Sequence, residues 1–232
     1  MGLSFLLALV AIFFIIERPI ENNPSSQNEE SEAVEKSPLS GNHSLEIKTA
    51  ESNILWQGER TILTTHVNTG TLALVSGSFE VENGVPTEGE FMVDMNSLTL
   101  TSVHGVGPRE GGGDMLLAHL KSSDFFDVEN FSEASFVLTS AEKTEGDFVY
   151  TVKGDMTIKG ITEEIVFPAE IYSREGNVIV DADLVLDRTR WDVSFGSENV
   201  FENLGDKVIA DEFMLEIRLI AGIPVGEPEF GL

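Results

Sequence analysis

Cysteine is absent from the 232 residues of the chain. This absence excludes disulfides, thiolate catalysis, and zinc–thiolate and iron–sulfur sites. It also excludes attachment to a membrane through a lipid-modified cysteine. A domain of this size does not need disulfides to be stable, so the composition is compatible with an oxidising compartment.

Basic residues are scarce. The chain has 14 Lys and Arg against 40 Asp and Glu, which gives a net charge of −26 with histidine neutral. Such a chain repels phosphate backbones and anionic lipid headgroups. We therefore expect no nucleic-acid partner, and any membrane contact has to come from apolar insertion. Solubility is the simplest reason for the excess of acid.

Motifs for catalysis and for metal binding are also missing. The glycine-rich stretch 105–113 has Glu110 where a dinucleotide-binding loop needs glycine, and Asp114 would bring negative charge to the following helix. No GxSxG nucleophile elbow is present. The histidines are too scattered to show metal-ligand spacing: His43, His66, His104 and His119. We predict no catalytic residue, no metal site and no cofactor, and thus no enzyme.

A hydrophobic run long enough for a typical membrane-spanning helix is lacking. The apolar segment from Leu3 to Ile16 is shorter than the roughly 20 residues that such a helix needs. We interpret residues 1–20 as an N-terminal hydrophobic anchor or signal segment, and favour an uncleaved anchor. Residues 21–43 are rich in Ser, Asn and Glu and are predicted to form a disordered polar linker.

Alternation with a period of two dominates the chain from about residue 44 to residue 220. Between Phe148 and Ile158 apolar residues alternate with mostly polar ones, and the pattern returns in 165–171, 178–186 and 213–219. Short turn sequences separate the alternating runs: Glu82-Asn83-Gly84, Glu145-Gly146-Asp147, Lys159-Gly160 and Glu175-Gly176-Asn177. The pattern predicts an all-β fold of about eight antiparallel strands, paired as two sheets or closed into a barrel.

Two segments depart from the strand pattern. Residues 114–120 are expected to form a short helix with Asp114 as its N-cap, and residues 198–204 a second short helix or turn.

The apolar strand faces are the remaining candidate site. A barrel of about eight strands is either filled by side chains or holds one small ligand, and periodicity alone does not choose between the two. We expect Trp56 and Trp191 at the mouth of the barrel or as plugs, and Asp187 and Arg188 in a structural ion pair or turn. The candidate ligand-binding residues are inward positions on the central strands: Phe91, Val93, Phe136, Leu138, Tyr150, Val152, Met156, Phe167, Ile171, Val180, Leu184, Phe213 and Leu215.

Four strings occur in an order and spacing that is specific. They are HLKSSDFFDV at 119–128, GDMTIKGIT at 154–162, DRTRWDV at 187–193 and LGDKVIAD at 204–211. With these strings, residues 44–221 resemble the YceI family, and the resemblance leaves residues 222–232 as a C-terminal tail. It implies a lipocalin-like antiparallel β-barrel with an elongated apolar pocket, which in relatives holds polyisoprenoids, isoprenoid quinones or fatty-acid-like amides. It also implies export to the periplasm and no catalytic residues.

The resemblance favours an extracytoplasmic protein, periplasmic or at the cell surface, that is tethered to the membrane by its N-terminal segment and holds a long-chain apolar lipid. Burial of about ten methylenes contributes on the order of 8 kcal/mol. Association costs about 4–15 kcal/mol, so a short chain binds marginally and a longer one comfortably. The alternative is a surface module with a filled barrel that binds no ligand. A homodimer is compatible with either function.

Overall fold

The computed structural model describes residues 35–62, 64–104, 112–144, 146–197, 199–200 and 208–222. The expected anchor at 1–20, residues 21–34 of the expected linker, most of the glycine-rich stretch, most of the second expected helix and the tail beyond Gly222 lie outside these ranges. The strands are β1 (His43–Ile47), β2 (Asn53–Ile62), β3 (Thr64–Glu82), β4 (Val85–Asp94), β5 (Glu133–Lys143), β6 (Val149–Ile158), β7 (Ile161–Arg174), β8 (Asn177–Asp187) and β9 (Val208–Gly222).

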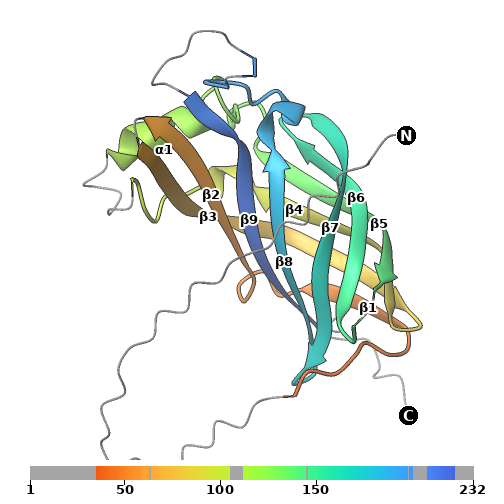
Figure 1. The fold of residues 1–232 in the computed structure, drawn as a ribbon. Helices are drawn as coiled ribbons and strands as arrows, with labels where there is room; N and C mark the ends of the chain where they lie inside the picture. Colours follow the sequence, from red (N-terminus) through yellow and green to blue (C-terminus); the bar gives the residue numbers. More distant parts are fainter. Residues whose placement is uncertain are drawn as a thin grey trace, which may run out of the picture. The chain divides into compact units, whose positions relative to one another are not determined.

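Strands β2 to β9 form a closed antiparallel barrel. Each strand is hydrogen-bonded to its neighbour in sequence, and β2 pairs with β9 to complete the ring. Closure leaves this ring without an exposed edge, which is the usual solution for strands with one apolar face. The all-β, lipocalin-like barrel expected from the sequence is confirmed (Figure 1).

The ninth strand, β1, occupies the same place in the barrel as β2. It pairs with residues 78–81 of β3 and with the end of β9, whereas β2 pairs with the earlier part of β3. Across the intervening turn, the Lys48 N–H donates to the Ile220 carbonyl (2.8 Å) and the Ile220 N–H donates to Ser52 Oγ (3.0 Å). β1 and β2, one after the other, thus together occupy one strand position between β3 and β9.

Tight two-residue turns join three of the strand pairs. Asn83-Gly84, Lys159-Gly160 and Glu175-Gly176 all have positive φ at both residues, between 51° and 79°. This is the conformation of type I′ turns, whose twist matches that of the flanking strands. Each turn lies where the sequence predicts a hairpin. The register of the paired strands is therefore set locally, because a two-residue loop allows little slippage.

One α-helix, α1 (Gly113–Lys121), and two 3-10 turns, η1 (Met95–Ser97) and η2 (Arg188–Trp191), accompany the strands in the described ranges. The prediction that Asp114 caps the helix is wrong. Gly112 is the N-cap, with φ 75°, and Asp114 lies in the first turn. Gly112 adopts the left-handed conformation without steric cost, so the helix begins at Gly113, two residues earlier than an Asp114 cap would allow. The negative charge of Asp114 suits the helix dipole in that turn.

The segment before β1 packs on the barrel, so the linker boundary predicted at residue 43 is wrong. Ser37 and Ser173 exchange two backbone hydrogen bonds of 3.0 and 2.7 Å. Leu39 is buried in the core, and Lys36 Nζ lies 2.6 Å from Glu170 Oε2. The polar composition of the segment did not predict this contact. One buried leucine and two backbone hydrogen bonds order a stretch that otherwise has little apolar surface.

Side chains fill the end of the barrel that carries the β3–β4 and β7–β8 hairpins. Leu39, Leu45, Val81 and Ala221 are buried there. Tyr150 is buried with them, and its hydroxyl donates to the Gly84 carbonyl at 3.1 Å. We call this end, defined by these five residues, the closed end.

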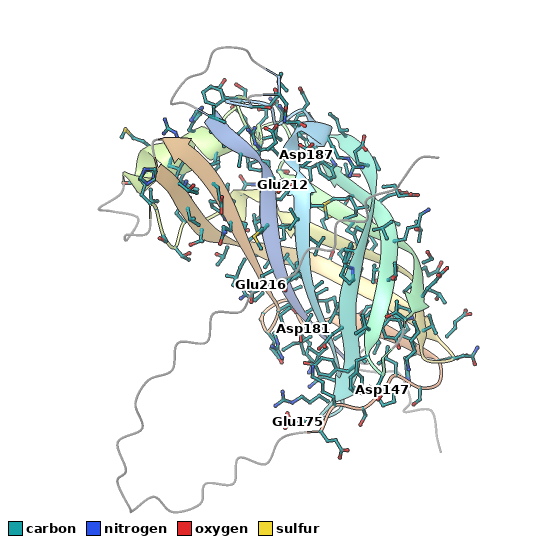
Figure 2. The ribbon with its side chains drawn as sticks, in the orientation of Figure 1. Asp147, Glu175, Asp181, Asp187, Glu212 and Glu216 are labelled. Atoms are coloured by element: carbon teal, nitrogen blue, oxygen red, sulfur yellow. The ribbon has the colours of Figure 1, made fainter. Side chains whose placement is uncertain are left out.

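Acidic side chains cover the outer face of β8 and β9, as Figure 2 shows for Asp181, Asp187, Glu212 and Glu216. Asp187 is the direct cross-strand partner of Glu212. Asp183 is likewise the partner of Glu216. Like charges directly opposite each other are unfavourable. Of these five acidic side chains, Asp181 alone has an ion pair within the described ranges, with Arg218 Nη1 at 3.7 Å from its carboxylate.

Candidate ligand cavity

A cavity of about 810 Å³ lies inside the barrel. Residues from β2 to β9 and from α1 line it, and most of the lining atoms are apolar. Its volume falls within the range of about 300–1,000 Å³ that is typical of small-molecule sites. The filled barrel that periodicity left open is therefore not the structure of this chain.

Twelve of the thirteen predicted ligand-binding residues line this cavity. The exception is Tyr150, which lies in the closed end with 1% of its surface exposed. Burial raises the pKa of its phenol. Alternation correctly placed Tyr150 inside the barrel, but alternation does not show how far along the axis the hollow extends. The lining residues are Phe91, Val93, Phe136, Leu138, Val152, Met156, Phe167, Ile171, Val180, Leu184, Phe213 and Leu215. Their contact with a ligand remains a prediction.

A row of phenylalanine rings crosses the cavity wall. The ring centroids of Phe79 and Phe91 lie 6.2 Å apart, those of Phe91 and Phe136 6.1 Å, and those of Phe136 and Phe167 5.6 Å. Phe136 and Phe167 meet across β6 because Gly154 lies between them. A Cβ at Gly154 would clash with the Phe136 ring and with the Val137 carbonyl. This close approach gives Gly154, the first glycine of the GDMTIKGIT string, a structural role.

The HLKSSDFFDV string builds the end of the cavity that lies opposite the closed end. His119 and Leu120 of α1 line it, as do Phe125 and Phe126 in the turn that follows. The His119 ring lies edge-on to Phe125, with centroids 4.9 Å apart, and its Nε2 is 3.2 Å from the carboxylate of Asp124. Sequence reasoning did not include these residues because the helix is too short to show a clear apolar face.

Exposure differs between the two ends of the lining. At the α1 end, Met115 is 78% exposed and Phe195 42% exposed. Toward the closed end, Phe79, Ile171 and Leu219 are all buried. We call the end at Met115 and Phe195 the open end, because lining side chains reach solvent there. The site is therefore a deep apolar pocket closed at one end.

The two tryptophans have different places. Trp56 lines the cavity, and its Nε1 donates to the Thr99 carbonyl at 3.1 Å. Trp191 is fully buried outside the lining, where its Nε1 donates to the Met156 carbonyl at 3.0 Å. Trp56 is thus part of the cavity wall, and Trp191 is part of the core.

Asp187 and Arg188 serve the fold, as the sequence suggests. Asp187 Oδ1 accepts the N–H of Thr189 at 2.9 Å and caps η2. Arg188 is 5% exposed and donates to the carbonyls of Ile209 and Ala210 and to Asp211. Burial lowers the pKa of Arg188, and the carboxylates of Asp211 and Asp187 partly oppose the shift. The arginine thereby ties the DRTRW string to the start of β9.

A metal site and a membrane-spanning helix each have requirements that can be compared with the described ranges. These ranges contain no group of three or more His, Asp or Glu side chains arranged to hold a metal ion. The single α-helix found in the same ranges is not of the length and hydropathy that a membrane-crossing helix requires.

Residues 45–221 match the model of the YceI-like domain. The chain belongs to the YceI family. The match covers the whole barrel and the cavity, which places the four sequence strings in their structural context.

Curated proteins that are similar to this chain include UPF0312 proteins. Similar proteins are those of Pseudomonas putida strain F1, 32% identical over 100 residues (43% of this chain, 47% of the relative), and of Photorhabdus laumondii, 31% identical over 102 residues (44% and 47%). A third, from Shewanella sp. strain ANA-3, is 34% identical over 95 residues (40% and 44%). The matched stretch spans about half the length of these relatives.

Two solved structures share the fold. BcnA of Burkholderia cenocepacia has a TM-score of 0.52 and 18% identity, covering 75% of this chain and 98% of its own. A polyisoprenoid binding domain from Saccharophagus degradans, described as implicated in plant cell wall breakdown, has a TM-score of 0.55 and 13% identity, covering 78% and 98%. At these identities the likeness supports the fold alone.

Proposed function

We propose that this YceI protein binds one long-chain apolar molecule, an isoprenoid or acyl lipid, inside its barrel. The observation that carries the proposal is the apolar cavity of about 810 Å³, closed at one end and exposed at the other. A chain that enters at the open end can bury its methylenes against apolar walls along its length. Each buried methylene contributes about 0.8 kcal/mol. The Saccharophagus degradans neighbour, a polyisoprenoid binding domain, supports the same class of ligand.

The proposed activity is binding without catalysis. Two polar groups of the lining have structural partners, since the indole N–H of Trp56 is bonded to Thr99 and the guanidinium of Arg188 to carbonyls of β9. General acid–base work needs a titratable group within reach of the reacting atom. An apolar chain offers such groups no reacting atom along most of the cavity.

We further propose that the protein acts outside the cytoplasm, in the periplasm or at the cell surface, tethered by the segment Leu3–Ile16. Support comes from the apolar composition of that segment and from the polar stretch after it. Because the net charge of −26 disfavours anionic membrane surfaces, the tether rather than the barrel would hold the protein at the membrane.

Organic extraction and native mass spectrometry of protein purified from its own host test the proposed binding. We expect one long-chain molecule per barrel, retained under native conditions and released by solvent. Protein that is purified without a bound ligand is then incubated with geranylgeraniol in detergent and measured again by native mass spectrometry. An empty barrel in both experiments contradicts the proposal.

A further inference from the structure

The inward face of β2 changes character toward the open end. Alternate residues Ile54, Trp56, Gly58 and Arg60 all line the cavity. The pairing of β2 with β9 is irregular between Gly58 and Arg60, and Arg60 remains a residue of the cavity wall beyond this irregularity. On the neighbouring strand β3, His66 is the direct partner of Arg60.

The Arg60 side chain has an unused donor. Its Nε is buried and has no hydrogen-bond partner in the described part of the chain. No carboxylate there forms an ion pair with Arg60, although Arg188, Arg190 and Arg218 each have one within 4.0 Å. A buried donor without an acceptor is unfavourable, and it is rare in native proteins. Arg60 is thus a cationic side chain of the cavity wall whose Nε no protein group in the described ranges satisfies.

Other nitrogen groups lie at the same end. The ring of His104 is edge-on to that of His66, with centroids 4.8 Å apart. The backbone N–H of His104 donates to Asn68 Oδ1 at 3.1 Å, and both His104 and Asn68 line the cavity. This end of an otherwise apolar pocket therefore carries imidazole and guanidinium groups, in a chain with only 14 Lys and Arg residues.

Two carboxylate residues also contribute to this end of the lining, Glu59 and Glu212. Glu59 directly precedes Arg60 on β2 and forms no ion pair in the described ranges. Glu212 is exposed and is the cross-strand partner of Asp187 on the outer face (Figure 2). Neither forms an ion pair with Arg60, so the guanidinium keeps its charge available to a ligand.

We propose that Arg60 binds the anionic headgroup, a carboxylate or a phosphate, of the amphiphile whose chain fills the cavity. This inference rests on the proposed function, because it assigns a headgroup to the same ligand. A charge-assisted hydrogen bond to a guanidinium is about twice as strong as a neutral one, and an apolar surrounding strengthens it further. The chain would point toward the closed end, with its charged oxygen atoms beside Arg60.

Competition with the apolar fluorophore N-phenyl-1-naphthylamine tests the proposal. Palmitate, hexadecyl phosphate and hexadecanol compete for the fluorophore in the wild type and in Arg60→Met. We expect the substitution to weaken at least one of the two anions tenfold or more and to change hexadecanol less than threefold. The anion that loses more identifies the headgroup. Arg60→Lys, which keeps the charge, should recover part of the loss.

Arg174→Met is the matched control, because Arg174 also has no ion pair in the described ranges and lies at the opposite end of the barrel beside the β7–β8 turn. It should leave all three affinities unchanged. Thermal unfolding confirms that each variant is folded. Inorganic phosphate at the same concentration should not displace the fluorophore, because it has no chain.

Equal losses for palmitate, hexadecyl phosphate and hexadecanol in Arg60→Met, or no loss for either anion, overturn the headgroup assignment. The proposed function survives that result, since the wild type still takes up the chain. A wild type that binds neither the fluorophore nor any of the three competitors overturns both.

Discussion

At the scale of single residues, a phenol hydroxyl marks where the cavity stops. Tyr150 belongs to the same inward series as Val152 and Met156, which both line the hollow. Its hydroxyl reaches the Gly84 carbonyl in the β3–β4 turn and satisfies a buried acceptor. The contact joins two hairpins that are far apart in sequence. It stabilises the closed end without touching the ligand space.

Tyr150→Phe is expected to reduce the free energy of unfolding by about 1 kcal/mol, because the Gly84 carbonyl loses its donor while the ring stays in place. Urea denaturation measures the loss. Binding of N-phenyl-1-naphthylamine should remain at its wild-type level. A variant that unfolds normally but binds the fluorophore much more weakly would show that Tyr150 belongs to the cavity after all.

At single residues, the predictions from the sequence differ from the structure for identifiable reasons. Alternation identifies the inward face, and twelve of the thirteen residues that it gave line the cavity. It carries no information on depth, so it does not show that Tyr150 lies beyond the hollow. It also passed over Arg60, because a charged residue at an inward position looks like a break in the pattern. Met115 and Phe195 were missed because a short helix and a loop have no period that marks a cavity wall.

At the scale of elements, the turns were the most predictable feature. Asn83-Gly84, Lys159-Gly160 and Glu175-Gly176 need positive φ, and few sequences supply it twice in succession. The start of the domain was less predictable. Leu39 is one apolar residue in a polar stretch, and its burial depends on a groove that only the folded barrel provides.

The pairing of β8 with β9 carries an electrostatic cost on its outer face. Asp183 and Glu216 are direct cross-strand partners and both are exposed. Glu216→Lys should therefore raise the free energy of unfolding by about 0.5–1 kcal/mol at low salt, since a repulsive pair becomes attractive. The gain is measured by urea denaturation in 20 mM and 1 M NaCl.

Salt should remove most of the Glu216→Lys gain, because it screens exposed charges. Glu216→Gln is the matched control. It removes the repulsion without adding attraction, and its gain should be smaller than that of the lysine variant. A gain that is equal at both salt concentrations would show that side-chain packing, and not charge, is responsible.

At the scale of the whole molecule, the barrel combines a filled end and a hollow. Ala221 and Ala182 illustrate the contrast, because both are buried inward residues on the paired strands β9 and β8. Ala182 lines the cavity, whereas Ala221 belongs to the packed core of the closed end. The same substitution at these two positions therefore meets open space in one case and close-packed atoms in the other.

Titrating N-phenyl-1-naphthylamine into the Ala182→Phe variant tests whether the barrel is hollow and receives an apolar chain. Ala221→Phe is measured beside it as the control. A phenyl ring at Ala182 should occupy the cavity, reduce fluorophore affinity at least tenfold and leave the unfolding midpoint unchanged or higher. The ring at Ala221 should cost about 1–3 kcal/mol of stability by overpacking. Wild-type affinity in Ala182→Phe, or a loss of stability equal to that of Ala221→Phe, would show that the barrel does not receive a chain at this position.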